Sequence, residues 1–466
     1  MNRKTTGLII AFLLVAACIQ AKENKAWKKD YKKIERHIVA PEFKDEVYKI
    51  TDFGAVPGDP VFLNHRAINE AIVQCSSNGG GVVMVPQGIW HCGPITLLAN
   101  VNLHLEKGAT LLFSTDPSQY PLVLTRWEGM DCYNYQPLIY AYEQDNIGIT
   151  GEGTIDGAGA NENWWKMCGA PRFGWTEGVT SQKIGRPLLS KWNNAGTPVK
   201  ERVLGEGHGM RPQLVNLYRC NNILVEGVSM VRSPFWTLHP LFCTNLTVRN
   251  VRFINDGPNG DGCDPESSSY VLIENCYFDT GDDCIAIKSG RNRDGRTANV
   301  PSQNIIVRNC TMKNGHGGVV VGSEISGGYR NLFVENCRMD SPELERAIRI
   351  KTSSARGGII EGIYVRNVEV GQCREAVLKI NLLYEPAEER PEEFFPTVRD
   401  VYLENVTSKK SRYGIMIVAY EDRTNVSNIH LTDCTFSSVE QEVRADGKIE
   451  DLKLTNVLMN GKTVEH

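Results

Sequence analysis

The sequence predicts an all-β protein folded as a right-handed parallel β-helix, a solenoid of short strands whose first end is covered by a helix. Three observations support this prediction. A strand-like phrase recurs nine times between residues 221 and 457. Successive copies begin 23 to 38 residues apart. Asn and Cys return at fixed positions, as in "RNC", "ENC" and "TDC". Together these features indicate a stack of similar coils.

Each copy alternates apolar and polar residues, the pattern of a strand with one buried face. The spacing is shorter than the roughly 40–45 residues of a propeller blade and suits one solenoid turn of two or three strands. Parallel crossovers are nearly always right-handed, which sets the expected hand. The copies are "NNILVEGV" (221–228), "TNLTVRNV" (244–251), "SYVLIENC" (269–276), "QNIIVRNC" (303–310), "RNLFVENC" (330–337), "EGIYVRNV" (361–368), "RDVYLENV" (399–406), "SNIHLTDC" (427–434) and "EDLKLTNV" (450–457).

The first 21 residues have the pattern of an export signal. Arg3 and Lys4 form the charged start, and an apolar run over 8–17 follows. Cleavage after Ala21 and a lipoprotein signal ending at Cys18 both fit, so a lipid anchor stays open. The apolar run is short for a membrane span, and no other segment could cross a membrane. We expect an exported protein of the bacterial periplasm or cell surface.

The remaining chain divides into a linker and one long domain. Residues 22–45 are predicted as an N-terminal linker and 46–466 as the β-helix. "NHRAINEAIVQCSSNGGG" (64–81) predicts the covering helix, with Asn64 as its cap and glycines at its end. Its apolar stripe consists of Ile68, Ala71, Ile72 and Cys75. Residues 156–215 interrupt the repeat and are interpreted as a long loop excursion over one face.

Composition excludes some classes of function. The chain has 51 Lys and Arg against 55 Asp and Glu, which gives no general signal for nucleic acid. It has 14 cysteines but no CxxC pair, so a structural zinc site is not indicated. An exported protein could pair cysteines in disulfides. Cysteines at a fixed repeat position instead favour stacked, buried thiols.

The stretch "TGDDCIAIKSG" (280–290) places two acids just before a buried strand. Adjacent carboxylates repel and resist burial, so a purely structural role explains them poorly. Aligning the coils sets Asp282 beside His316 of "GHGG", matches Asp261 with Asp282, and matches Lys351 with Lys288.

Strands of neighbouring coils lie about 4.8 Å apart, so side chains far apart in sequence should form one patch. That patch contains three acids and three basic groups: Asp261, Asp282, Asp283, His316, Arg349 and Lys351. A crowded carboxyl can hold a proton near neutrality while its neighbour stays ionised and activates water. This division of labour is what glycoside hydrolysis requires, and the basic groups indicate an anionic substrate.

At these residues the sequence resembles the polygalacturonase family of pectin hydrolases, glycoside hydrolase family 28. The family motifs appear in order as Asn259-Gly260-Asp261, Gly281-Asp282-Asp283, Gly315-His316-Gly317 and Arg349-Ile350-Lys351. Gly260 replaces the family's Thr, which puts the local geometry in doubt.

The resemblance implies a role for each matching residue. Asp282 would be the general acid, Asp261 and Asp283 would activate water with inversion, and His316 would tune the acid. Substrate-binding candidates are Arg349, Lys351, Asn259, Lys288 and, in "INLLYEP", Tyr384. The resemblance implies no metal and no cofactor, a pectic polysaccharide or oligogalacturonide as substrate, and we expect a monomer.

Several functions remain open at this stage. "GSEISGG" (322–328) and the 156–215 excursion resemble chain-end-acting bacterial members, so we expect an exo-acting enzyme. A rhamnogalacturonan-directed hydrolase of the same family is the main rival. A pectate lyase would use calcium, and a non-catalytic β-helix that binds carbohydrate would not need the four motifs.

Overall fold

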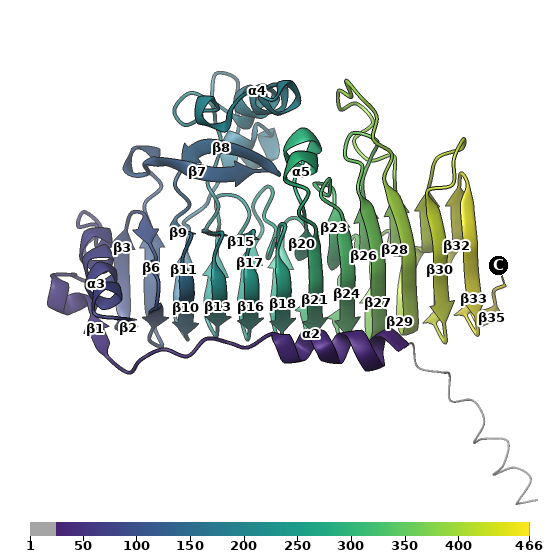
Figure 1. Ribbon diagram of the computed structural model, residues 1–466, viewed down its shortest axis with the longest axis horizontal. Coiled ribbons are helices and arrows are strands. Elements are labelled where there is room, and N and C mark those ends of the chain that lie inside the picture. Colours follow the sequence, from purple (N-terminus) through teal and green to yellow (C-terminus); the bar gives the residue numbers. More distant parts are fainter. Residues whose placement is uncertain (1–24, 466) are drawn as a thin grey trace, which may run out of the picture.

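The structure is a computed structural model that describes residues 25–465. It confirms the predicted fold class: nearly all strands pair in parallel, coil upon coil, in a right-handed β-helix (Figure 1). The predicted export signal and Cys18 lie outside the described residues. Within residues 25–465, no helix is long and apolar enough to cross a membrane.

Three sets of parallel strands run the length of the solenoid. The first set is β1 (Val47–Lys49), β2 (Gly81–Val85), β5 (Val101–Leu105), β10 (Asp145–Gly151), β13 (Asn221–Glu226), β16 (Thr244–Arg249), β18 (Ser269–Glu274), β21 (Ser302–Arg308), β24 (Tyr329–Glu335), β27 (Ile359–Gln372), β29 (Thr397–Val418), β30 (Val426–Thr432) and β33 (Ile449–Thr455). The second set is β3 (Gly88–Cys92), β6 (Ala109–Phe113), β11 (Thr154–Asp156), β14 (Ser229–Val231), β17 (Arg252–Asn255), β19 (Tyr277–Thr280), β22 (Thr311–Met312), β25 (Arg338–Met339), the later parts of β27 and β29, β31 (Thr435–Phe436) and β34 (Leu458–Met459), on which β35 (Lys462–Thr463) folds back antiparallel.

The third set carries the site discussed below. It is β4 (Ile95–Thr96), β9 (Ile139–Tyr142), β12 (Val215–Tyr218), β15 (Leu238–Leu241), β20 (Ile285–Ile287), β23 (Val319–Gly322), β26 (Arg346–Lys351), β28 (Ala376–Asn381), the end of β29, and β32 (Val439–Asp446). Cys263 bridges β15 to β20, which keeps the third set continuous.

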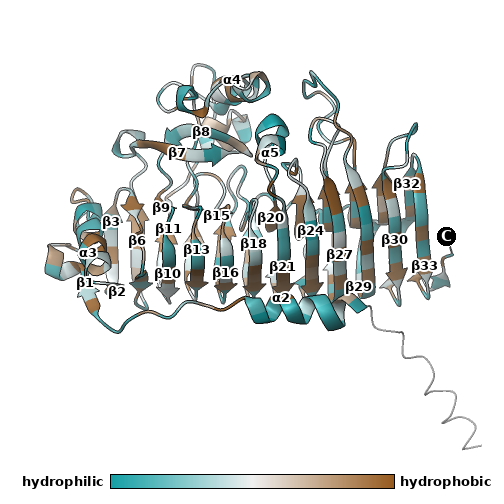
Figure 2. Cartoon of the chain, viewed as in Figure 1, coloured by the Kyte–Doolittle hydropathy of each residue, from teal (hydrophilic) through white to brown (hydrophobic). Residues whose placement is uncertain are grey.

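The core forms because the alternation stays in register from coil to coil. Val271 pairs with Ile305, which pairs with Leu332, and all three side chains are buried. Figure 2 shows the result as alternating brown and teal bands on β27 and β29. Burial of apolar surface, at about 25 cal/mol per Å², therefore accumulates along the whole stack.

The predicted Asn ladders are present. Asn222 donates to Asn146 at 3.1 Å, and Asn245 donates to Asn222 at 2.9 Å. Both Asn222 and Asn245 adopt positive φ, a conformation that Asn tolerates better than most residues. An amide both donates and accepts, so identical side chains can bond along the stack.

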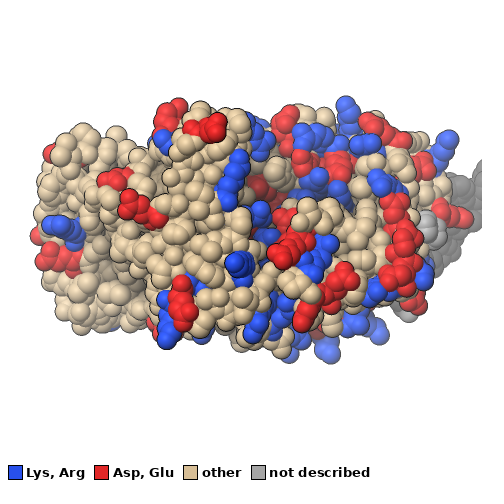
Figure 3. All heavy atoms as spheres, turned by 90° about the horizontal axis from the view of Figure 1, so that it is seen from above, with Lys and Arg blue, Asp and Glu red and all other residues tan. Residues whose placement is uncertain are grey.

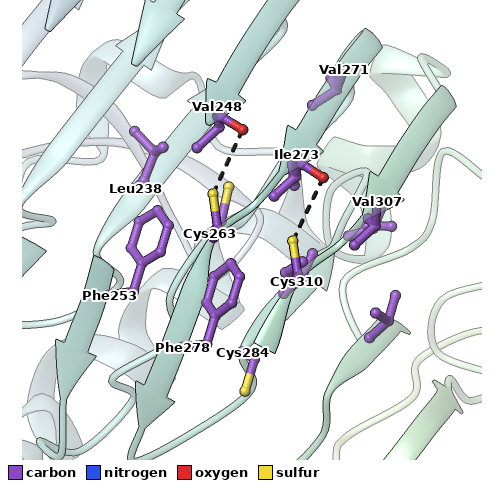
Figure 4. Packing of buried hydrophobic residues seen from close by; sticks show 14 of the residues in the cluster. Leu238, Val248, Phe253, Cys263, Val271, Ile273, Phe278, Cys284, Val307 and Cys310 are labelled. Carbon is purple, nitrogen blue, oxygen red and sulfur yellow. Dashed lines mark hydrogen bonds between the residues drawn. The ribbon is translucent and has the colours of Figure 1, made fainter. Parts of the chain in front are cut away.

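The predicted stacked thiols are also present, because all 13 cysteines in the described chain are free and 12 of them are buried. Cys310 donates to the carbonyl of Ile273 in the preceding coil (Figure 4). Burial raises the pKa of the Cys310 thiol, which makes it a poor nucleophile.

The predicted covering helix is α3 (His65–Ser77), which lies over the first coils at the left of Figure 1. Its buried face contains the four predicted residues Ile68, Ala71, Ile72 and Cys75, and also Ala67. The predicted side-chain cap is wrong, however. Asn64 precedes the helix, but its amide bonds to the backbone of Val56 and His91 instead. It therefore fastens the helix to the first coil.

The segment predicted as a linker is ordered from residue 25. A π-helical turn η1 (Trp27–Tyr31) continues into α2 (Lys32–His37). Trp27, Tyr31 and Ile34 are buried against the outer faces of β18, β21 and β24 at Leu272, Ile306 and Phe333. We call residues 26–37 the strap, because they run across the lower edge of the strands (Figure 1).

The segment predicted as a long excursion lies between β11, which ends at Asp156, and β12, which begins at Val215. It holds η4 (Trp165–Cys168), η5 (Pro171–Phe173), α4 (Gln182–Ala195) and η6 (Val199–Glu201). An unpredicted antiparallel hairpin, formed by β7 (Leu122–Trp127) and β8 (Met130–Tyr135), lies beside α4 above the coils (Figure 1). Further short helices are η2 (Ile50–Phe53), η3 (Pro117–Gln119) and α5 (Asn292–Ala298).

Candidate active site

The site lies where β20, β23 and β26 stand side by side. Ile285 pairs with Val319, which pairs with Ile348. Extending this register back along the chain sets Asp282 level with His316, as predicted, and the His316 amide donates to the Asp282 carbonyl at 3.1 Å. Lys351 is level with Gly322 and, one coil earlier, with Lys288, which confirms their predicted match.

The predicted match of Asp261 with Asp282 is wrong by one position. Cys263 bridges to Ile285, and the Gly262 amide donates to the Asp283 carbonyl, so Asp261 is level with Asp283. The match fails because residues 256–268 follow a loop rather than a regular strand.

A pocket of about 360 Å³ opens above these strands. Eight of the nine predicted site residues line it: Asn259, Asp261, Asp282, Lys288, His316, Arg349, Lys351 and Tyr384. Asp283 is fully buried beneath them. Figure 3 shows Lys, Arg, Asp and Glu gathered around a hollow in the upper face.

Asp282 and His316 form a hydrogen-bonded pair, with 2.9 Å between His316 Nδ1 and Asp282 Oδ1. The bond and charge of Asp282 outweigh burial and raise the pKa of His316 to about 9. Burial tends to raise the pKa of Asp282, but His316, Lys351 and Arg349 together hold it well below its ordinary value. The pair therefore holds one proton at neutral pH, and that proton resides on His316.

Asp283 lies between two cations. Lys351 Nζ is 2.7 Å from Asp283 Oδ2, and Arg349 Nη1 is 3.3 Å from Asp283 Oδ1. Two cations around one carboxylate leave an excess positive charge facing the pocket. Tyr384 lies over both, with its ring centre 5.6 Å from the Arg349 guanidinium carbon and 5.4 Å from Lys351 Nζ.

Asp261 has a different environment. Burial, with the nearby carboxyls of Asp264 and Asp282, raises the pKa of Asp261 well above its ordinary value, and Lys288 only partly opposes this. The expected division of proton affinity is therefore reversed in the free protein: Asp261, not Asp282, is the acid that holds a proton more tightly. The physical reason is that the cations gather on the side of Asp282.

Asn259 and Lys288 line the pocket and are themselves held by contacts with other protein groups. Asn259 accepts a hydrogen bond of 2.7 Å from the buried Arg211. Lys288 Nζ lies 3.2 Å from Glu324 Oε2 and 4.3 Å from the ring centre of Trp236. Both residues therefore reach the pocket already engaged with protein groups.

One oxygen each of Asp261, Asp282 and Asp283 lie within 4.8 Å of one another, and carboxylate oxygens suit a hard cation. In this protein Asp283 already faces Lys351 and Arg349, Asp282 faces His316, and Asp261 faces Lys288 at 3.7 Å.

Sequence reasoning missed several lining residues: Glu128, Arg186, Trp236, Glu324, Glu345, Arg346 and Glu385. Glu324 could have been predicted from the repeat, because it directly follows β23 in the coil next to the one that carries Lys288. Arg346 begins β26 and Glu345 directly precedes it, so these two also lie on the repeat. Glu128, Arg186 and Glu385 stand on excursions with no repeat to align.

A wall of ion pairs closes one side of the pocket. Glu128 in the β7–β8 turn contacts Arg186 of α4 at 2.6 Å. Arg186 contacts Glu385, from the loop after β28, at 3.2 Å. Arg291 contacts both Glu128 and Glu385 at 3.1 Å. Segments from distant coils therefore meet over the site, and we call Glu128, Arg186, Arg291 and Glu385 the pocket wall.

Comparison with known proteins agrees with this geometry. The sequence profile described as Glycosyl hydrolases family 28 matches residues 190–396. The crystal structure of a hyperthermoactive exopolygalacturonase from Thermotoga maritima is 41% identical, covers 93% of this chain and 96% of its own, and superposes with a TM-score of 0.89.

The chain belongs to glycosyl hydrolase family 28. It is thus a glycoside hydrolase. A probable polygalacturonase of Vitis vinifera is 29% identical over 78% of this chain and 70% of its own length. An exo-poly-alpha-D-galacturonosidase of Dickeya chrysanthemi is 28% identical over 73% of this chain and 57% of its own length.

Proposed function

We propose that this family 28 hydrolase is an exported, exo-acting polygalacturonase that releases galacturonic acid from the ends of pectic chains by an inverting acid/base mechanism. The observation that carries the proposal is the pocket itself. Acid/base groups lie on its floor beside Arg349 and Lys351, and the pocket wall closes one side. The 41% identical exopolygalacturonase of Thermotoga maritima supports the mode of attack.

The acid of the reaction is the His316–Asp282 pair. Its single proton passes through Asp282 to the glycosidic oxygen as the carbon–oxygen bond breaks, which leaves neutral His316 and ionised Asp282. Asp282 and His316 both line the pocket, and His316 passes its proton to Asp282 along the hydrogen bond of 2.9 Å. The general acid thus does not need a raised pKa of its own.

Asp261 and Asp283 hold the attacking water. A direct attack on the sugar would need an accessible carboxylate, but Asp283 is fully buried and held by Lys351 and Arg349. A water that loses its proton to one of these acids can reach the anomeric carbon. One oxygen from each of Asp261, Asp282 and Asp283 lies within 4.8 Å of the others, which is a closer grouping than the roughly 6.5–9.5 Å between the two carboxyl groups of most inverting enzymes. The stereochemistry is tested directly. Proton NMR should show the β-anomer first; an initial α-anomer would contradict inversion.

The substrate carboxylate binds at Arg349 and Lys351, where two cations face a single Asp283. Arg offers a planar pair of donors and Lys a point charge, and both suit a uronate. Tyr384 covers the two and presents an aromatic face to the sugar. These contacts favour galacturonate at the site of cleavage.

Export is part of the proposal because the first 21 residues have the pattern of an export signal. We place the enzyme in the bacterial periplasm or at the cell surface, as a monomer, with a lipid anchor if Cys18 is modified. Fractionation with labelling by a radioactive fatty acid would test both parts.

The main test is product analysis on polygalacturonate and on rhamnogalacturonan oligosaccharides, with wild type and Asp282→Asn in parallel. We expect monomeric galacturonic acid from polygalacturonate, lost in the variant. Mixed oligomers at early times would overturn the exo mode. Activity only on the rhamnose-containing substrate would transfer the specificity to the rival hydrolase, and no activity on either would favour a binding protein.

A further inference from the structure

A second carboxyl group lies directly behind Asp261. Asp264 is fully buried, and neither of its carboxyl oxygens has a hydrogen-bond donor among the described residues. It does not line the pocket, whereas Asp261 does. Burying an ionised carboxyl without donors is costly, so this residue needs a physical explanation.

The charges around Lys288 provide one. Lys288 Nζ lies 3.7 Å from Asp261 Oδ2, 3.6 Å from Asp264 Oδ1 and 3.2 Å from Glu324 Oε2. Glu324 also faces Arg291 at 3.6 Å. Despite burial, Lys288 and Arg291 keep the pKa of Glu324 well below its ordinary value, so Glu324 is ionised. One shared ammonium is then left for Asp261 and Asp264.

Two buried carboxyls beside one shared cation do not both ionise readily. We infer that Asp261 and Asp264 share one proton, and that Asp264 is a positioning residue that holds this proton while Asp261 acts as the base. The shared proton would lie between the two carboxyls and fix the orientation of Asp261. Lys288 stabilises the negative charge that remains on the pair.

Over one turnover, the protons taken up by the catalytic groups equal the protons that they release. The pair starts with one proton, and Asp261 takes a second from the attacking water as the new carbon–oxygen bond forms. The proton for the leaving oxygen comes from His316–Asp282, so the two transfers use different groups. One proton then leaves the Asp261–Asp264 pair for solvent and one returns to His316.

The pKa of Asp264 agrees with a proton shared between Asp261 and Asp264. Burial raises the pKa of Asp264 to about 8, with Lys288 and Asp261 opposing the rise and Asp283 and Asp282 adding to it. The carboxyl of Asp264 therefore binds a proton in the pH range in which the hydrolase would work. Coupled groups of this kind titrate as a pair rather than singly.

The test compares two substitutions at this position on polygalacturonate. Asp264→Asn keeps a neutral donor to Asp261, so kcat should stay within about tenfold of wild type and the acidic limb of kcat/KM should keep its position. Asp264→Leu removes the donor, so kcat should fall by about 100-fold with KM little changed, and the acidic limb should move to higher pH because ionised Asp261 loses a stabilising hydrogen bond. Asp279→Asn, on β19, is the matched control and should leave both the rates and the pH profile unchanged.

Equal loss in the Asn and Leu variants would overturn the proposal, and so would two active variants with an unchanged pH profile. Infrared spectroscopy gives a readout that is independent of activity. The band of a protonated carboxyl should be present in wild type at pH 6 and weaker in Asp264→Asn. Its persistence in that variant would place the proton elsewhere. The role as positioning residue rests on the proposed function, but the infrared result does not, so the two can fail separately.

Discussion

The proton shared by His316 and Asp282 makes each residue depend on the other. Asp282→Asn removes the acceptor and the acid together, so kcat on polygalacturonate should fall by roughly 10²–10⁴-fold. Initial rates of reducing-sugar release measure this. The exposed Asp45→Asn is the control and should have no effect. A variant with near wild-type kcat would remove Asp282 from the role of acid.

The raised pKa of His316 sets the alkaline limit of activity. A raised pKa in the folded protein means that the proton is held more tightly, so the pair keeps it until the pH rises through about 9. The free enzyme's kcat/KM should therefore fall as the pH rises through about 9. In His316→Asn the fall near pH 9 should disappear together with most of the activity. An unchanged alkaline limb in that variant would assign it to another group.

At the residue scale, the sequence predicted what lies on the repeat and missed what lies off it. Asp282 and His316 were matched correctly because β20 and β23 differ by a constant register. Asp261 was placed one position off because a loop precedes its bridge. Asp264 escaped notice because its importance comes from burial and from the missing donors, neither of which is visible in a pattern.

At the scale of elements, the strap should contribute measurably to stability. Trp27 is buried against Phe333, and Arg366 lies over its ring at 3.9 Å. Trp27→Ala should lower the free energy of unfolding by about 3–5 kcal/mol, the usual cost of removing a buried Trp. Denaturant titration measures this, with the exposed Lys33→Ala as control. An unchanged midpoint would show that the strap is not docked in solution.

The pocket wall belongs to the same scale because four separate segments build it. Arg186→Ala removes the contacts from α4 to both Glu128 and Glu385. Longer chain segments should then enter the pocket, and the first products from polygalacturonate should include di- and trimers. Chromatography of early products tests this, with Lys191→Ala on the same helix as control. Release of monomer alone by the variant would show that other groups determine the exo mode.

Elements were predicted where periodicity was long and missed where it was short. Helix α3 spans 13 residues with a clear apolar stripe, and its position at the first coil was correct. The strap has only a few apolar residues between charges, so its composition resembles a linker. The β7–β8 hairpin has no partner in the coil repeat and could be found only from the structure.

At the scale of the whole molecule, stability should not depend on disulfides. All 13 cysteines of the described chain are free, and Cys168 alone among them is not fully buried. The thermal midpoint of the chain from residue 22 should be the same with and without reductant. A thiol reagent should label about one cysteine in the native protein and 13 after unfolding. A midpoint lowered by several degrees in reductant would indicate a disulfide.

The overall fold was the most predictable level, because nine copies of one phrase report the same local geometry. Each copy confirms the others, so errors in single strands do not alter the result. The same redundancy explains the limit of the prediction. The repeat predicts the coils, whereas substrate specificity depends on the segments that lie outside the coils.

The strap also imposes an order of assembly. Its residues 26–37 are synthesised before the coils, yet the surface that receives Trp27 is completed by Phe333, about 300 residues later. The strap therefore cannot dock fully until those coils have formed, and contacts of such long range slow folding. Docking of the strap is therefore a late event in folding, which can finish only after the middle coils have formed. A chain cut before Phe333 would leave its amphipathic start exposed to chaperones and proteases.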